Sequence, residues 1–204
     1  MNHKVNNVQG LYASATDLYT KIVVGDDASA DSILSNLREG IENLKNNWKG
    51  IDAGKKIQEV ITVHNEMVTV RNVLAQLSFD SSVVAAQYRD IQNANGAGME
   101  YLSPIQIQPA QVLPDHTDLA DTVDIVPAAE IGKNLIDAAN TDLDTFIQNV
   151  TYKYNEIMDN WTAGTGRDNA QGAFDEFVAN ARKYKNILTE TSEHIAAALK
   201  NYTF

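Results

Sequence analysis

The chain has 204 residues, of which 44% are hydrophobic and 21% are charged, a composition typical of globular proteins and unlike that of disordered ones. Its 27 acidic and 16 basic side chains give a net charge of -11, which disfavours binding to nucleic acid and to anionic membranes. The sequence contains no cysteine, which excludes disulfides, thiolate nucleophiles and zinc–thiolate sites.

Neither a targeting segment nor a membrane span is expected. The N-terminal residues Met1-Asn2-His3-Lys4 lead into polar sequence without an apolar stretch, so we expect no conventional signal peptide. Apolar runs remain shorter than the roughly 18 residues that a membrane-spanning helix requires.

Apolar residues in the first half of the chain recur at steps of three and four, which is the spacing of helices packed side by side. This pattern predicts a helix over residues 8–47, broken near Gly25 and restarted with Asp27 or Ser29 as its N-cap. A second helix is predicted over residues 52–93. The pattern is carried by Leu34, Leu37, Ile41, Leu44 and Trp48, and then by Val60, Val63, Met67, Val70, Leu74, Leu77, Val84 and Tyr88.

Residues 95–127 contain all four prolines of the chain, together with glycines and several aspartates. A proline inside a helix costs about 3 kcal/mol, so this segment interrupts the helical pattern and leaves the segments before and after it free to be helical. Scattered apolar residues favour contact with the rest of the protein. We therefore expect an extended strap that lies along the surface.

Beyond the strap, the same spacing predicts helices over residues 128–160 and 168–201. No segment alternates with a sustained period of two, so the predicted fold class is all-α. The pattern is carried by Leu143, Ile147, Val150, Tyr154, Ile157 and Trp161, and then by Phe174, Phe177, Ala181, Tyr184, Leu188, Thr191, Ile195, Ala198 and Tyr202.

The two halves match each other when Trp48 is placed on Trp161. The offset is 113 positions up to the tryptophans, where Leu37 falls on Val150, and 114 after them, where Val60 falls on Phe174. The extra residue lies in the turn, and only a turn absorbs an insertion without rotating the following helix by about 100°. With the first offset, two upstream pairs are also expected to match, namely Leu18 with Ile131 and Ile22 with Leu135. We predict a duplicated helical hairpin.

A helical hairpin with Trp-x-Gly in its turn resembles the WXG100, or ESAT-6-like, family of small type VII secretion proteins. Trp48-Lys49-Gly50 matches the motif, and Trp161-Thr162-Ala163-Gly164 departs from it by one inserted residue. The resemblance covers nearly the whole chain outside the strap. It implies an antiparallel four-helix bundle, formed as a pseudo-dimer by hairpins 1–94 and 128–204, with the tryptophan turns at opposite ends.

The length of the strap 95–127 fits this arrangement, because about 30 extended residues reach roughly 100 Å and a forty-residue helix spans about 60 Å. Exported members of the family often carry Tyr-x-x-x-Asp/Glu after the second helix. Here Tyr88 is followed at the fourth position by Gln92, so we expect any export signal to come from a partner.

The resemblance implies that Trp48 and Trp161 form a recognition cleft with the backbone of the turn glycines Gly50 and Gly164. The alternative reading of the same residues is that each indole covers the end of the core, and both roles are compatible if one ring face stays exposed. The exposed aromatic residues expected to add contacts with a protein partner are Tyr88, Tyr101 and Tyr202.

The sequence predicts no catalytic, cofactor or metal site. His64 and His194 are expected at exposed or flanking helix positions, and no His-Glu-x-x-His or Glu-x-x-His spacing occurs. The glycines in residues 164–168 are typical of a phosphate loop, but they follow a predicted helix instead of a strand, so we expect a turn with Asp168 as N-cap. No nucleophile motif is present, and we predict that the protein is not an enzyme.

The predicted function is a non-enzymatic helical module for protein–protein interaction. The resemblance implies a substrate, adaptor or carrier of a type VII-like secretion system, with a secretion ATPase, a toxin or another ESAT-6-like chain as partner. Such a protein is made in the cytoplasm and exported without a conventional signal peptide, as a monomeric pseudo-dimer or a homodimer. The alternative is a structural subunit of a helical cell-surface or phage-derived assembly, in which neighbours exchange straps.

Overall fold

The computed structural model of this chain describes residues 4–117 and 122–201, except for the side chain of Thr165. Its elements are β1 Lys4–Val5, α1 Val8–Asp17, the π-helix η1 Leu18–Val23, α2 Ala30–Asn47, β2 Trp48–Lys49, α3 Ile51–Ala94, β3 Asp124–Ile125, α4 Ala129–Asn160, β4 Trp161–Ala163 and α5 Thr165–Asn201. The all-α prediction is therefore confirmed. The described strands are only two or three residues long.

The predicted interruption of the first helix is confirmed. Helix α1 begins at the N-cap Asn7, whose side chain accepts a hydrogen bond from the Gly10 amide, and η1 continues it to Val23. A short loop follows, in which Ala28 has a φ of 45°. Ser29, rather than Asp27, then caps α2, since its hydroxyl accepts the Ser32 amide at 3.1 Å.

The other helices agree with the expected ranges to within a few residues. Helix α5 begins at Thr165, three residues before the predicted start, so Asp168 lies in its first turn and is not its N-cap. An acidic side chain there still interacts favourably with the N-terminal end of the helix dipole. The Asp168 amide donates to the Gly164 carbonyl at 3.3 Å, which places Gly164 immediately before the helix.

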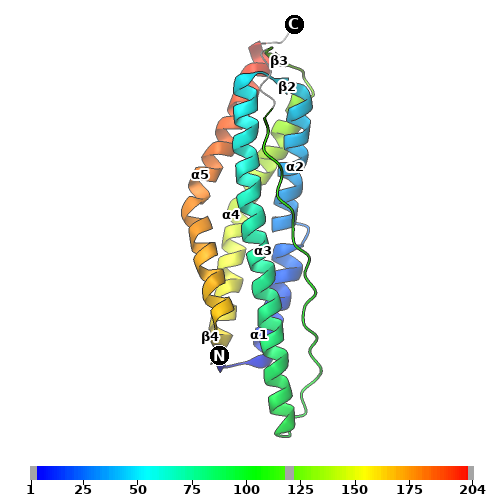
Figure 1. Cartoon of the computed structure of the whole chain (residues 1–204), viewed down its shortest axis with the longest axis vertical. Helices are drawn as coiled ribbons and strands as arrows, with labels where there is room; N and C mark the ends of the chain where they lie inside the picture. Colours follow the sequence, from blue (N-terminus) through cyan, green and yellow to red (C-terminus); the bar gives the residue numbers. More distant parts are fainter. Residues whose placement is uncertain (1–3, 118–121, 202–204) are drawn as a thin grey trace.

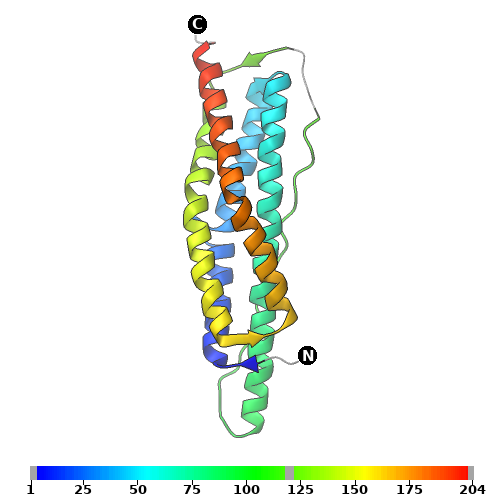
Figure 2. The same ribbon diagram turned by 90° about the vertical axis from the view of Figure 1, so that its left-hand side faces the viewer.

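The helices lie along one another and give the molecule an elongated shape (Figures 1 and 2). Helix α2 packs against α4, α3 packs against α5, and each half has its own internal contact, α3 with α1 and α2, and α4 with α5. Strand β2 lies at one end of the molecule and β4 near the other (Figure 1). Helix α3 extends past β4, and the chain turns back from its tip (Figure 1).

One core of buried apolar side chains runs through the helices. Its largest fully buried members come from both halves and include Leu11, Leu18, Ile33, Leu37, Ile41, Leu44, Ile57, Ile61, Met67, Leu74, Phe146 and Trp161. Burial of each such side chain contributes about 1.5–3 kcal/mol to stability. The aromatic residues of the second half stack within it, with ring centroids 6.1 Å apart for Tyr154 and Phe174.

The segment after α3 returns along the same helix in an extended conformation, as the thin green trace in Figure 1 shows. Gly96 and Gly98, with φ values of 89° and 66°, reverse the chain at the tip of α3. The described part of this strap, residues 99–117, then runs antiparallel to α3 toward β3.

The predicted repeat is reproduced in the burial of matched positions around and after the tryptophans, for example Leu37 with Val150 and Leu74 with Leu188. The upstream match of Leu18 with Ile131 is wrong, because Leu18 is fully buried and Ile131 is 58% exposed. The strands show the reason. Val5 pairs with Trp161, and Ile125 pairs with Trp48. The stretch of chain from Val5 to Trp48 is seven residues longer than the equivalent stretch from Ile125 to Trp161. The interruption between η1 and α2 accommodates this difference.

Candidate functional site

The two tryptophan turns are the first candidate site, and each is closed by a segment from the other half of the chain. Trp48 pairs with Ile125 and Lys49 with Asp124 in an antiparallel bridge between β2 and β3. Val5 pairs with Trp161, and Lys4 with Ala163, between β1 and β4. The segment that leads into one hairpin thus pairs with the turn of the other hairpin.

The backbone at the Trp48 turn explains its glycine. Trp48 ends α2 in an extended conformation, with φ -139° and ψ 116°, and its amide donates to the Leu44 carbonyl. Gly50 has a φ of 123°, a backbone conformation that residues with a side chain rarely adopt. A Cβ atom at this position would lie 3.4 Å from a methyl carbon of Val123. A glycine therefore allows the chain to turn from β2 into α3 beside the segment that precedes β3.

A cavity of about 510 Å³ opens beside the Trp48 turn. Its walls come from both halves of the chain and include Trp48, Gly50, Ile51, Val123, His194 and Ala198. Trp48 itself is only 6% exposed, but Ile51 is 46% exposed and Val123 is 64% exposed. The apolar rim therefore remains accessible to a partner, while the indole is a largely buried wall of the cavity.

The Trp161 turn is closed more tightly. Its indole is 1% exposed and its Nε1 donates to the Ala163 carbonyl at 2.6 Å. The Asn6 amide donates to the Asn160 carbonyl at 2.9 Å, and the Arg167 guanidinium donates to the Thr162 carbonyl at 2.9 Å. Both indoles therefore match the reading in which they cover the end of the core, and Trp48 in addition lines an open cavity.

Two of the three tyrosines expected at an interaction surface, Tyr88 and Tyr101, do not lie with Trp48. Tyr88, near the end of α3, is half-buried and packs against the core, and Tyr101 on the strap is 77% exposed with the Arg89 guanidinium 4.7 Å from its ring centroid. Both are at the opposite end of α3 from Trp48, about 60 Å away along a helix of 44 residues. Tyr202 lies outside the described residues.

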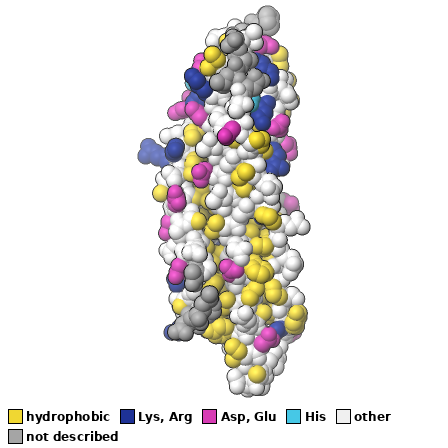
Figure 3. All heavy atoms as spheres, in the orientation of Figure 1, with side chains coloured by type: hydrophobic (Ala, Val, Ile, Leu, Met, Phe, Trp, Pro, Cys, Tyr) yellow, Lys and Arg dark blue, Asp and Glu magenta, His cyan; other side chains and the backbone are white. Residues whose placement is uncertain are grey.

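The face that carries the strap is poor in charge. Hydrophobic side chains, in yellow, gather on the lower half of this face, where α3 and the strap lie (Figure 3). The strap has a single charged residue, Glu100, between Asn95 and Pro114. For a protein with a net charge of -11, this face is unusually uncharged.

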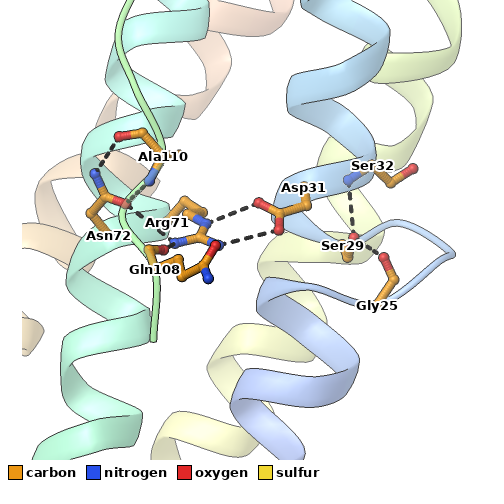
Figure 4. Close-up of polar contacts among 8 residues, drawn as sticks. All are labelled: Gly25, Ser29, Asp31, Ser32, Arg71, Asn72, Gln108 and Ala110. Atoms are coloured by element: carbon orange, nitrogen blue, oxygen red, sulfur yellow. Dashed lines mark hydrogen bonds and ion pairs between the residues drawn. The ribbon is translucent and has the colours of Figure 1, made fainter. Parts of the chain in front are cut away.

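A row of amide side chains on α3 holds the strap, and sequence reasoning missed it. Asn72 accepts a hydrogen bond from the Ala110 amide at 2.8 Å and donates one to the Ala110 carbonyl at 3.0 Å (Figure 4). Asn65 likewise accepts a hydrogen bond from the Leu113 amide at 2.8 Å and donates one to the Leu113 carbonyl at 2.9 Å. Gln58 accepts from the His116 amide at 2.6 Å. Asn65 and Asn72 bind the main chain of the strap, so these contacts do not depend on the identity of its side chains, whereas Gln58 also donates to the Asp115 carboxylate at 2.9 Å.

The spacing of this row has a geometric reason. The α3 residues Gln58, Asn65 and Asn72 are seven apart, which is about 10.5 Å along a helix. Their strap partners are three apart, which is about 10 Å in an extended chain. Polar amides at a regular seven-residue spacing along one helix were the available sequence signal for this feature.

A buried ion pair strengthens the same contact. The Arg71 guanidinium binds both carboxylate oxygens of Asp31 on α2, at 2.9 and 3.2 Å, and also donates to the Gln108 carbonyl of the strap (Figure 4). The Arg71 side chain is 5% exposed. A cavity of about 550 Å³ beside it is lined by α2, by Arg71 and by strap residues 108–111. The strap thus lies in a groove between α2 and α3.

His64 was expected on the surface, and this prediction is wrong. It is fully buried on α3, and its Nδ1 lies 3.0 Å from the side-chain Oδ1 of Asn65. Burial lowers the pKa of His64, because a charged imidazole is poorly solvated there, and the nearby Arg38 lowers it further. Helix α2, which carries Arg38, packs against α3 and contributes to the burial of His64.

Two further observations bear on the possible chemistry. In the described part of the chain, no three His, Asp or Glu side chains are placed to hold a metal ion. Among the same residues, no helix is both long enough and apolar enough to cross a membrane. Neither observation identifies a function.

Comparison with known proteins adds no relative. No family model, no curated protein and no solved structure matches this chain. Its function must therefore be argued from its own geometry.

Proposed function

We propose that this protein is a fused pair of ESAT-6-like hairpins, an antiparallel four-helix bundle that forms a pseudo-dimer within one chain. The observation that supports this arrangement is the reciprocal closure of the turns, in which β3 covers the Trp48 turn and β1 covers the Trp161 turn. Two-fold symmetric dimers exchange equivalent contacts in this way. The position of β2 and β4 toward opposite ends of the molecule is compatible with antiparallel hairpins.

The proposed function is non-enzymatic binding of another protein. The observation that carries it is the open cavity of about 510 Å³ at the Trp48 turn, with an aromatic wall and the exposed apolar residues Ile51 and Val123 at its rim. Apolar and aromatic groups around a concave site are the usual anchors of protein contacts. The Trp161 turn is closed, so the two ends of the molecule have different roles in the proposal.

By resemblance, the partner class is a secretion ATPase, a toxin or another ESAT-6-like chain, and the role is that of substrate, adaptor or carrier of a type VII-like system. The protein is made in the cytoplasm in this proposal and leaves the cell with the partner. The test compares the culture medium of the native host with and without its type VII secretion ATPase. Loss of the protein from the medium in the second strain is the expected result, and unchanged export contradicts this role.

The binding site itself is tested by cross-linking in the native host. Ile51→Asp places a charge at the cavity rim, and Ile131→Asp places the same charge at an exposed isoleucine of α4 that does not line this cavity. The proposal predicts that Ile51→Asp loses a specific cross-linked partner and that Ile131→Asp keeps it. Equal retention by both variants contradicts binding at the Trp48 turn.

Light scattering after size-exclusion chromatography separates this proposal from a structural subunit. A discrete monomer or dimer is expected for an adaptor. Large or filamentous species that form through exchanged straps would favour the structural alternative.

A further inference from the structure

Part of the group that holds the strap on the first hairpin has counterparts on the second, whereas Gln58 and Asn65 correspond to Gly172 and Ala179. The offsets that align the halves place Asp31 on Asp144, and Arg71-Asn72 on Lys185-Asn186. Lys185 forms an ion pair with Asp144, as Arg71 does with Asp31. The repeat therefore carries an ion pair between its two helices and, next to the cation, an asparagine.

The two copies differ in what covers them. The Arg71 side chain lies beneath the strap and is 5% exposed, whereas that of Lys185 is 33% exposed. Asn72 forms two hydrogen bonds with the main chain of Ala110. Asn186 is exposed, and its side-chain amide has no hydrogen-bond partner within the described part of the chain. The same group of residues is thus occupied on the first hairpin and open on the second.

The surroundings of Asn186 suit an extended chain. On α4, Ile147 stands at the position of Leu34 and is half-buried, and Tyr152 stands at the position of Glu39 and is 63% exposed. Leu34 and Glu39 line the groove that holds the strap. Apolar contact with a bound peptide is therefore available on the second hairpin beside the free amide.

A cavity lies farther along α5, toward its C-terminal end. Ala196 corresponds to Ser82, whose hydroxyl accepts the Ile105 amide of the strap at 2.9 Å. On the second hairpin, Ala196 and Leu199 line a cavity of about 340 Å³. Ten helix residues separate Asn186 from Ala196, about 15 Å, which five residues of an extended peptide span.

The charges near Asn186 indicate which kind of side chain such a peptide would carry. Arg182 and Lys183 lie one turn before Asn186, both exposed, and neither forms an ion pair within the described residues. They occupy the positions of Val68 and Thr69 on α3, toward which the strap runs after Ala110. A peptide held at Asn186 in the same direction would place its next residues beside two cations. This favours an acidic side chain there.

We propose that the outer groove between α4 and α5 binds an extended peptide segment of a partner protein. Asn186 holds the main chain of this segment, and Arg182 and Lys183 contact an acidic residue one or two positions later. The inference rests on the internal repeat and does not depend on the proposed role in secretion.

The test uses two fluorescent synthetic peptides and the full chain. The first has the strap sequence of residues 102–114, and the second is the same peptide with Gln111→Glu. Fluorescence polarisation is measured with the wild-type protein, with Asn186→Ala and with Asn169→Ala, an exposed asparagine elsewhere on α5. The groove of the first hairpin is already filled by its tethered strap, whose effective concentration is of the order of millimolar.

The expected result is saturable binding of the Gln111→Glu peptide, several-fold tighter than that of the parent peptide and weakened by salt. Asn186→Ala weakens binding about tenfold through the loss of two hydrogen bonds, and Asn169→Ala leaves it unchanged. Absence of saturable binding overturns the proposal, as does equal binding by Asn186→Ala. A dimer of the protein that Asn186→Ala dissociates would identify a second copy as the occupant and also overturn it.

Discussion

The contact between Asn72 and the strap allows a direct test of how the strap is held. Asn72→Ala removes two hydrogen bonds to Ala110, of 2.8 and 3.0 Å, and each contributes about 1 kcal/mol net. Ala110 is half-buried, so water partly replaces the lost partner. We expect the free energy of unfolding to fall by about 1–2 kcal/mol.

The internal repeat supplies the matched control. Asn186→Ala makes the same change at the equivalent position of α5, where the side chain is exposed, and a surface change of this kind alters stability by less than about 0.5 kcal/mol. Urea unfolding followed by circular dichroism measures both variants. A second readout is hydrogen exchange of the strap amides, which is expected to accelerate about tenfold near Ala110 in Asn72→Ala only.

The pattern of results decides between two explanations. A fall in stability with faster exchange confined to the strap shows that the Asn72 amide holds the extended chain. Equal effects of Asn72→Ala and Asn186→Ala, or unchanged exchange at the strap, would refute the argument that main-chain contacts from α3 fix it.

Three further perturbations have expected outcomes, each measured by urea unfolding. Gly50→Ala forces a side chain into a φ of 123° and is expected to cost about 1–3 kcal/mol; a loss below about 0.5 kcal/mol would contradict the strained turn. Asp31→Ala leaves the Arg71 charge buried and costs about 3 kcal/mol, whereas the exposed counterpart change Asp144→Ala costs less than about 1 kcal/mol; equal losses would contradict the difference in cover. The pKa of His64 is lowered in the folded state, so its neutral form stabilises the protein above pH 6.5, and this stability is lost as the pH falls and the unfolded chain takes up the proton. Relative to a His64→Gln variant, the wild type is expected to lose up to about 1.4 kcal/mol per pH unit below 6.5, and parallel pH profiles would show that burial does not shift this group.

Helices were predictable because their signals are local. The clustering of all prolines in one segment, the steps of three and four in apolar residues, and a serine at the restart of α2 each act within a few positions. The start of α5 was placed too late, since Gly166 was taken as part of a turn and the structure includes it in the helix.

The closure of the turns was not predictable from local pattern. Strands β1 to β4 have two or three residues each, and they pair segments that are far apart along the chain. No alternation of apolar and polar residues can emerge over so short a length. The burial of His64 has a similar cause, because it depends on how α3 packs against the other helices and not on the sequence around the histidine.

The row of amide side chains on α3 had a sequence signal, but this signal can be recognised only when the position of the strap is known. Amides at positions 58, 65 and 72 resemble a solvated helix face until an extended segment with a matching repeat of three lies beside them. The duplication then explains why Asn186 and Lys185 stand where they do. Asn186 is exposed and Lys185 is only partly covered, because the described part of the strap lies on α3.

The measurement that tests the central claim most directly is the distance between the two tryptophan turns in solution. The chain has no cysteine, so Lys49→Cys with Thr162→Cys introduces two unique labelling sites, one beside each tryptophan. Pulsed electron paramagnetic resonance on the spin-labelled protein is expected to give a single distance of about 50 Å, the length of the 32-residue helix α4 that separates the two ends. A distance below about 25 Å would place both turns at one end and contradict the doubled antiparallel hairpin.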